Sequence, residues 1–502
     1  MIIRREGEQV TMNVNKKYGK LVLMILITFI SQLLVLSKSS IVAGLFGTGN
    51  DIDAYNIAIN ITSFLFSFVL AGISTVVIPE FVKKENKKSV DTFITTVYGI
   101  LVICVAVMIL FRFQIAEIFS NRDGFFTALV AYFLVILLVS QTVSSFANIT
   151  VAFFQCENKY NIPKIIQLIS QIGVISALIF LKDLTVTHYA LIVAAGVVFG
   201  AVLDAVIAVK NGFRYKPALV FDTHTKGLFK RFFPIILSTG VCRLSLIIDS
   251  VIASFLDTGK ITILNYSSQI SAMVDAVIVG NLVLYLYPKI TKQVQTNEPQ
   301  EIFWKQTVVF HSITCLVVAG FFSVGAEAVD LLFEHGSFTK EAGTLLFTGA
   351  AIYIFGHQLG IIRDLIYRYF YASGNTKTPA TNSVIVSVVN IAVSLILVKL
   401  IGFYGIIIGT VLSSAVSLTM ALIAFLRKIT FKVKIKRVFM RYILNFLIMV
   451  ATVLLVFLTK NAVPISNDVL AIIVFGCETV LIYAGLTFLF NRKILTFAKT
   501  IV

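Results

Sequence analysis

The chain has 502 residues, of which 58% are hydrophobic and 13% are charged, and its formal net charge is +17. A soluble domain has about a quarter of its residues charged, so this composition argues against a soluble enzyme. The lysines and arginines lie in short loops between long apolar runs, where they can contact anionic lipids, so we expect membrane lipids and no nucleic acid as partners. The composition therefore predicts a polytopic membrane protein with an all-α fold.

Fourteen apolar segments are each long enough to cross a bilayer, which takes about 20 residues in a helix. Residues 1–20 are polar and basic, and the first apolar run after them is expected to act as a signal anchor. The predicted transmembrane helices are 21–44, 55–78, 92–111, 126–154, 162–181, 188–210, 231–256, 261–288, 303–333, 342–372, 378–402, 404–426, 439–459 and 469–490. The least distinct divisions are the one after 181 and the one at the sequence GFYG of 402–405.

The loops on one side of these helices carry most of the 42 lysines and arginines. The positive-inside rule assigns that side to the cytoplasm, and it predicts that both termini lie there. An even number of helices requires the termini to share a side, so the charge pattern and the helix count agree.

The two halves of the chain resemble each other. Residues 43–49 (AGLFGTG) align with 253–259 (ASFLDTG), and residues 154–163 align with 370–379 through a shared Phe and Pro. Because six helices separate the copies, they would have the same orientation, as in a parallel repeat. We therefore predict two pseudo-symmetric lobes of six helices around a central cavity, followed by two further helices. The predicted parts are a cytoplasmic segment 1–20, an N-lobe 21–210, a cytoplasmic linker 211–230, a C-lobe 231–426, a basic cytoplasmic linker 427–438, helices 439–490 and a cytoplasmic tail 491–502.

Sequence motifs for an ATPase or for a metal centre are missing. No Walker A sequence is present, and the two glycines of Gly47-Thr-Gly49 are expected to form a tight turn. The five cysteines have no metal-ligand spacing. We expect no resident cofactor or metal, and energy from Na⁺, from H⁺ or from the membrane potential.

Ionisable residues inside membrane helices usually face a water-filled cavity or a partner. Lys38 and Arg243 lie in the equivalent first helices of the two lobes and are expected to point into the cavity, where they could hold a diphosphate. Asp249 is a candidate coupling site for a proton or Na⁺, or else a partner for Arg243 or for an amide. Arg363 and Arg368 are further cavity candidates. Asp364 and Arg368 are four residues apart on one helix and are expected to pair.

Three segments resemble the MurJ/MviN family of lipid II flippases. The first is 41–56 (IVAGLFGTGNDIDAYN) with 77–81 (VIPEF). The second is 253–266 (ASFLDTGKITILNY) with 286–289 (LYPK), and the third is 332–338 (LFEHGSF) with 368–379 (RYFYASGNTKTP). Together they cover most of the first twelve predicted helices.

The resemblance implies a two-lobed transporter of the multidrug/oligosaccharidyl-lipid/polysaccharide superfamily in a bacterial cytoplasmic membrane. Such a protein moves an undecaprenyl-diphosphate-linked glycan by alternating access, makes and breaks no bonds, and holds the lipid tail in a groove bordered by the last two helices. Asp53 matches the family and would help to gate the outer mouth. We expect a monomer.

The resemblance also has departures. Lipid II flippases typically carry arginines at several cavity positions. The corresponding residues here are Gln32, Lys38, Ser67 and Gln269, and Ser39 follows Lys38 in place of an acidic residue. Only Lys38 keeps a charge, so the cargo could be lipid II or the repeat unit of another wall polymer or exopolysaccharide. Two other functions remain as hypotheses. One is a cation-coupled multidrug antiporter, and the other is a glycan polymerase or ligase, which would need larger outer loops.

Overall fold

The computed structural model describes residues 28–498 except 84–85, 120–121, 123, 158, 160, 297–299 and 429–434. The residues it describes form helices joined by short loops, and none of them forms a strand. Twelve of these helices are long and apolar enough to cross a membrane. Residues 1–27 and half of the predicted basic linker 427–438 lie outside the described part.

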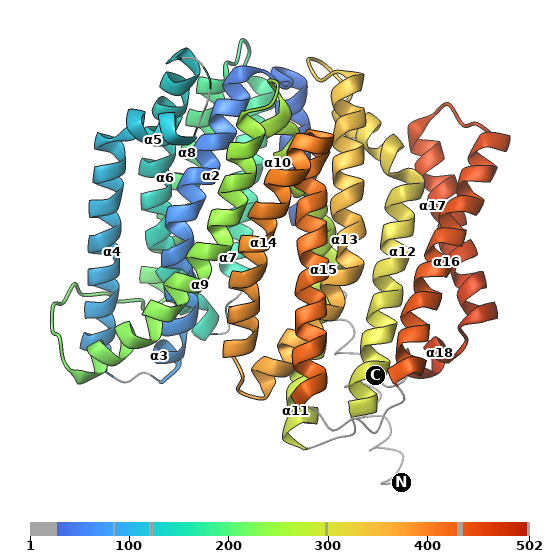
Figure 1. The fold of residues 1–502 in the computed structure, drawn as a ribbon. Helices are drawn as coiled ribbons and strands as arrows, with labels where there is room; N and C mark the ends of the chain where they lie inside the picture. Colours follow the sequence, from blue (N-terminus) through green and yellow to red (C-terminus); the bar gives the residue numbers. More distant parts are fainter. Residues whose placement is uncertain are drawn as a thin grey trace, which may run out of the picture.

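The first half of the chain forms one side of the helical bundle (Figure 1). It begins with a helix at Thr28–Phe46. The elements that follow are α2 (Asn50–Gly72), the π-helical segment η1 (Ile73–Val77), α3 (Ile78–Lys83), α4 (Lys87–Leu110), α5 (Arg112–Phe119), α6 (Gly124–Cys156), α7 (Asn161–Phe180) and α8 (Val186–Lys210). We call these helices the first half.

The second half lies beside it, with α9 running along the first half (Figure 1). Its elements are α9 (Thr223–Ser254), α10 (Lys260–Val274), the π-helical segment η2 (Asp275–Gly280), α11 (Asn281–Gln295), α12 (Gln300–Phe333), α13 (Lys340–Ala372), α14 (Lys377–Ile401) and α15 (Phe403–Lys428). Three further helices complete the chain: α16 (Ile435–Ala462), α17 (Asp468–Phe490) and α18 (Lys493–Ala498).

Two of the fourteen predicted transmembrane helices are not among the twelve apolar ones. They are 231–256, within α9, and 261–288, within the continuous segment from α10 to α11. Both are helical, and η2 divides the second of them into two α-helices of 15 residues each. The first eight residues of α9 were not predicted as helix, because the stretch from Thr223 to Lys230 is too polar to be counted as membrane helix.

The π-helical segments occupy corresponding places in the two halves. Each half has a helix that continues through a short π-helical segment into another helix: α2–η1–α3 in the first half and α10–η2–α11 in the second. The two aligned connections also match. The Lys159 N–H donates to the Phe154 carbonyl (2.8 Å), and the Asn375 N–H donates to the Phe370 carbonyl (2.9 Å). Phe154 aligns with Phe370 and Lys159 aligns with Asn375, so the two similar sequences form the same turn.

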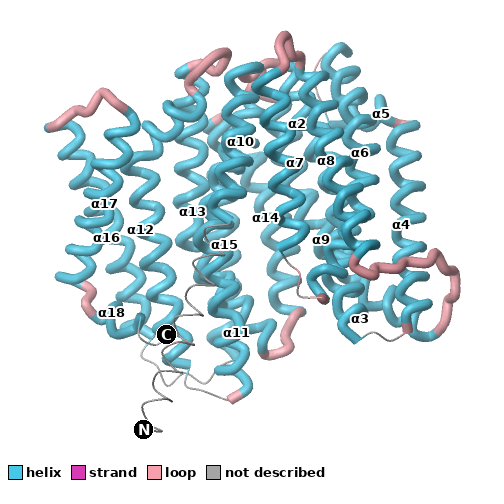
Figure 2. The backbone as a smooth tube through the Cα atoms, turned by 180° about the vertical axis from the view of Figure 1, so that it is seen from behind, coloured by secondary structure: helices cyan, strands magenta, loops and turns pink. Residues whose placement is uncertain are grey.

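The loop between α8 and α9 packs along the lower end of α4 (Figure 2). The Val220 N–H donates to the Thr92 hydroxyl, and the Tyr215 hydroxyl lies 2.7 Å from that of Thr95. Asp222 caps α9 and accepts a hydrogen bond from Ser89 of α4. These bonds lower the pKa of Asp222 to about 2, so it stays ionised at neutral pH. The predicted linker 211–230 is therefore partly helical and fixed to the first half.

Candidate functional site

Asp53 joins the two halves at the start of α2, which is the upper end of that helix in Figure 1. It lies in the first turn of α2 and is fully buried. Its carboxylate accepts hydrogen bonds from the Gly259 N–H (2.8 Å), the Thr262 N–H (2.9 Å) and the Thr262 hydroxyl (2.6 Å), all at the start of α10. Arg122 lies 3.0 Å from the same carboxylate. Asp53 thus caps a helix of the opposite half, where the helix dipole favours a negative charge.

A row of asparagines continues this contact down α2. Asn56 donates to the Thr262 hydroxyl (3.1 Å), and Asn60 donates to the Ser250 hydroxyl (2.7 Å). Residues 53, 56 and 60 recur on one face of the helix. We call Asp53, Asn56 and Asn60 the inter-half seam. Arg122 and the two asparagines were not predicted from the sequence; spacing from Asp53 could have indicated the asparagines, but no sequence signal indicates Arg122.

Loops from both halves interlock beside the seam. The Ser337 N–H donates to the Gly44 carbonyl (2.8 Å). Gly47 has a φ of +59°, which confirms the tight turn expected for it. Gly259 approaches so closely that an added Cβ would lie 2.8 Å from Thr48, so the two aligned segments meet here. The upper end is therefore closed between the halves.

Gly336 gives a direct test of this closure. It has a φ of +60°, and an added Cβ would lie 2.2 Å from the Gly44 carbonyl oxygen. The Gly336→Ala variant should therefore open the upper end. We expect a longer mean distance between spin labels placed on the exposed residues Lys182 and Lys340, measured by pulsed electron resonance in a cysteine-free background.

Gly374→Ala is the matched control, because Gly374 also has a positive φ (+76°) but has no atom within 4 Å of an added Cβ. It carries the same backbone strain without the close approach. If both variants change the label distance equally, strain alone explains the result, and the interlocked loops do not hold the upper end closed.

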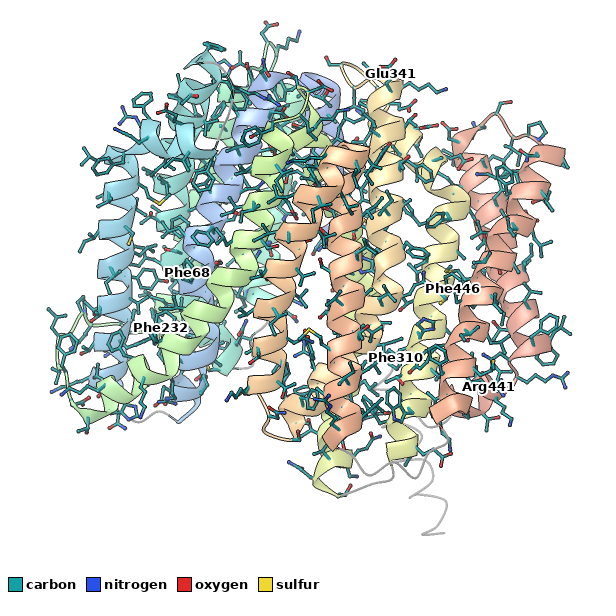
Figure 3. The ribbon with its side chains drawn as sticks, viewed as in Figure 1. Phe68, Phe232, Phe310, Glu341, Arg441 and Phe446 are labelled. Atoms are coloured by element: carbon teal, nitrogen blue, oxygen red, sulfur yellow. The ribbon has the colours of Figure 1, made fainter. Side chains whose placement is uncertain are left out.

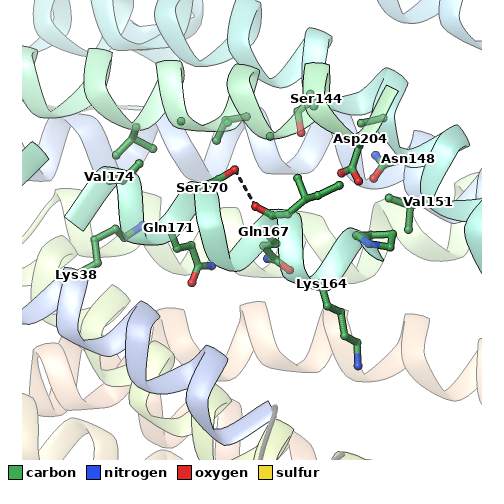
Figure 4. A pocket seen from close by; sticks show the side chains of 18 of the residues that line it. Lys38, Ser144, Asn148, Val151, Lys164, Gln167, Ser170, Gln171, Val174 and Asp204 are labelled. Atoms are coloured by element: carbon green, nitrogen blue, oxygen red, sulfur yellow. Dashed lines mark hydrogen bonds between the residues drawn. The ribbon is translucent and has the colours of Figure 1, made fainter. Parts of the chain in front are cut away.

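Lys38 lines a polar cavity of about 500 Å³ within the first half. The cavity lies between the first helix and α6, α7 and α8, and amides and hydroxyls make up most of its polar lining (Figure 4). The polar lining residues are Lys38, Ser144, Asn148, Gln155, Lys164, Gln167, Ser170, Gln171 and Asp204. The next residue, Ser39, donates to the Gln269 amide oxygen across the two halves (2.8 Å).

Arg243 is not part of that cavity. Its side chain is exposed on α9 and makes no ion pair within the described part of the chain. Arg243 is thus not among the lining residues of this cavity, and the expectation that Lys38 and Arg243 face one cavity between the lobes stays a prediction. Gln32 and Ser67 are partly buried, and the Ser67 hydroxyl donates to the Phe64 carbonyl of its own helix.

Asp249 lies among oxygen-bearing side chains of α14 and α15. It is 4% exposed, and its Oδ2 lies 3.4 Å from the Asn390 amide nitrogen and 3.5 Å from the Thr410 hydroxyl. The Ser394 hydroxyl lies 3.5 Å from the Asn390 amide oxygen. The other carboxylate oxygen of Asp249 has no hydrogen-bond partner among the described residues. Of the two partners considered from sequence, an amide is present and Arg243 is not.

The remaining charged candidates lie on α13. The Arg363 Nε lies 2.9 Å from the Asp364 Oδ1, and the Arg368 guanidinium stacks 5.5 Å from the Tyr287 ring centre. The predicted pairing of Asp364 with Arg368 is therefore wrong, because the neighbouring arginine reaches the carboxylate first. His357 lies 3.6 Å from Asp275 at the start of η2.

An apolar groove of about 390 Å³ lies between α12, α13, α15 and α16. Phe446, which lies between α12 and α16 in Figure 3, lines it together with Leu418 and Leu422. His311 and Gln358 are polar residues in its lining. The sequence predicted a groove bordered by the last two long helices. Of these two, only α16 contributes residues to the lining of this groove.

Comparisons with known proteins agree with this arrangement. The sequence profile described as "Lipid II flippase MurJ" matches residues 42–475. A protein of Thermotoga maritima named "Probable lipid II flippase MurJ" is 25% identical over 403 residues, 77% of this chain and 80% of that protein. One of Rickettsia prowazekii with the same name is 23% identical over 408 residues, 78% of this chain and 80% of that protein.

Solved structures resemble the fold. A structure titled "Lipid II flippase MurJ, inward closed conformation" has a TM-score of 0.79 at 20% identity and covers 94% of this chain and 100% of its own. An inward-facing multidrug resistance MATE family transporter of the MOP superfamily has a TM-score of 0.67 at 13% identity and covers 79% and 94%. At these identities the likeness establishes the fold alone.

Proposed function

Because the chain belongs to the MurJ family of lipid II flippases, we propose that it carries an undecaprenyl-diphosphate-linked glycan across a bacterial cytoplasmic membrane by alternating access. The chain is a multi-pass membrane protein of a transporter family and not an enzyme. The cargo would be lipid II or the repeat unit of another wall polymer or exopolysaccharide. The observation that carries the proposal is the buried seam at Asp53, which closes one end of the bundle between the two halves.

The proposed architecture has fourteen transmembrane helices, in two lobes of six and a final pair. The twelve apolar helices, α9 and the α10–η2–α11 segment would supply the fourteen. The matching π-helical segments and the matching turns at Phe154 and Phe370 support a repeat with boundaries near 21–210 and 231–426. Both termini would lie in the cytoplasm with the basic loops, and the protein would act as a monomer.

In this proposal the diphosphate binds near Lys38, with Arg243 as a second cation when the halves rearrange. Gln32, Ser39, Ser67 and Gln269 would contact the headgroup as neutral donors and acceptors. Arg363 and Arg368 would add positive charge from α13. The lipid tail would lie in the apolar groove beside α16, where a chain of isoprene units can be buried without polar partners.

Transport can be tested with purified protein in liposomes. Fluorescent lipid II, a polyprenyl-diphosphate oligosaccharide and a cationic dye are offered separately, and the transbilayer movement of each is measured. The proposal expects movement of at least one diphosphate lipid. Movement of the dye alone would support the alternative, a cation-coupled multidrug antiporter, which is suggested by the MATE-like fold and by the buried Asp249.

Asp249 is the proposed coupling site for a cation. Its free carboxylate oxygen and the hydroxyl oxygens of Ser394 and Thr410 could contact a hard cation such as Na⁺, joined by the Asn390 amide oxygen when that amide is turned over. The Asp249→Asn variant should weaken the response of the flipping rate to an imposed Na⁺ or pH gradient. The rate is measured in liposomes with imposed ion gradients.

The Thr410→Val variant distinguishes coupling to Na⁺ from coupling to protons. It removes one oxygen without changing the charge, so it should weaken a Na⁺ response by about tenfold and leave a proton response unchanged. An Asp249→Asn protein that responds to both gradients as strongly as the wild type would remove Asp249 from coupling.

A further inference from the structure

Asp204 lies in the polar cavity of the first half without a partner. It is on α8 and is 8% exposed, and its Oδ1 accepts no hydrogen bond from any described residue. It is the only carboxylate among the residues that line the cavity. A buried ionised carboxylate without protein partners is costly at membrane depth, so a bound cation or a proton would stabilise it.

The cavity around Asp204 supplies further oxygen atoms. Figure 4 shows Asp204 near Asn148 and Ser144 of α6, at the far end of the cavity from Lys38. The amide oxygen of Gln171, on α7, also has no hydrogen-bond donor within the described residues. Both unsatisfied atoms in this cavity are acceptors. Such atoms can be satisfied by a hydrogen-bond donor or by a cation, and not by an anion.

The charged groups that face the cavity are few. The first helix contributes Lys38, α7 contributes Lys164, and α8 contributes Asp204; the lining residues of α6 do not titrate. Lys164 extends away from Asp204 in Figure 4, and neither lysine forms an ion pair with it. With Asp204 ionised, these three groups sum to one positive charge. When a cation neutralises it, they sum to two.

We propose that Asp204 takes up a monovalent cation, either a proton or Na⁺, and that this uptake strengthens binding of a diphosphate beside Lys38. The effect on diphosphate binding rests on the proposed function, whereas cation uptake by Asp204 does not. The site is distinct from Asp249, which lies between α9, α14 and α15. Because linkage is reciprocal, a bound diphosphate would also raise the affinity of Asp204 for the cation.

Cation uptake is measured first without any lipid substrate, on the full chain in nanodiscs. One arm measures binding of ²²Na⁺, and the other measures protons released as the pH is raised from about 5.5 to about 8. The Asp204→Asn variant should lose one cation per protein in one of the two arms, and Asp204→Glu should keep it. Asp183→Asn, in an exposed loop at a φ of +53° that suits asparagine, is the control and should match the wild type.

Coupling is measured second, with undecaprenyl diphosphate as the probe. The wild type should bind it about tenfold more tightly when the cation is present, the size of one charge interaction across such a cavity. Asp204→Asn should bind tightly under all conditions.

Equal cation uptake by Asp204→Asn and the wild type in both arms would overturn the proposal. Cation uptake that leaves probe binding unchanged would overturn the coupling. No binding of the probe by the wild type would instead count against the proposed function, while the first measurement still decides whether Asp204 is a cation site.

Discussion

The Asp53→Asn variant is expected to open the upper end of the bundle and to lower flipping by at least tenfold. In the wild type, the Asp53 carboxylate accepts three hydrogen bonds from the start of α10 and faces Arg122. An amide has only one oxygen, so at least one buried N–H would lose its acceptor and Arg122 would lose its counter-charge. Together these losses weaken the closed state by about 3 kcal/mol, which changes its population ratio by about a hundredfold.

The opening is measured with the spin labels on Lys182 and Lys340, and flipping is measured in liposomes. Asp51→Asn is the matched control: Asp51 lies in the same first turn of α2, but it is exposed. The two variants change the charge equally. A label distance that stays short in Asp53→Asn would show that the interlocked glycine loops are enough to close this end.

Arg122→Gln tests whether the ion pair or the helix cap matters more. The side chain of Arg122 is 12% exposed, so the pair is partly screened, whereas the cap to Gly259 and Thr262 is buried. Arg122→Gln should therefore open the upper end less than Asp53→Asn does. This order would assign most of the closing energy to the cap.

The apolar runs of the sequence were enough to find most of the helices. The least distinct division, at GFYG, is a true helix break, because Gly402 has a φ of +62° between α14 and α15. The start of α9 was missed, although Asp222 followed by Thr225 is a recognisable N-cap pattern. The start of α9 is polar, and a search for apolar runs does not detect helical segments that lie outside the membrane.

Contacts between the halves could not be read from the sequence. The spacing of residues 53, 56 and 60 places them on one face of a helix, but nothing in the chain identifies Gly259, Thr262 or Ser250 as their partners. The same limit applies to the prediction that Lys38 and Arg243 face one cavity. Equivalent positions in a repeat share a place along the helix, but the rotation of each helix decides which cavity a side chain enters.

Lys38→Ala is expected to weaken binding of undecaprenyl diphosphate by about ten- to a hundredfold. Lys38 is the charged residue kept at the positions where related flippases carry arginine, and it lines a polar cavity. A charge-assisted hydrogen bond to phosphate contributes about 1.5 to 3 kcal/mol, which sets this range. Binding is measured by titration of the purified protein, with its thermal stability checked in parallel.

Arg243→Ala should also weaken binding, by about tenfold, because an unpaired arginine on a membrane helix is stable only where it meets water or an anion. Lys182→Ala removes a positive charge from an exposed loop and should leave binding unchanged. Unchanged binding in both Lys38→Ala and Arg243→Ala would remove both residues from the site.

Lys38→Arg decides how the charge is used. If Lys38 acts only as a point charge, arginine should restore binding to the wild-type level. If the site can use two parallel hydrogen bonds to one phosphate, arginine should exceed it, because the guanidinium matches that geometry and an ammonium does not. Tighter binding by Lys38→Arg than by the wild type, for lipid II in particular, would indicate that lysine at this position tunes the cavity toward a different diphosphate-linked glycan.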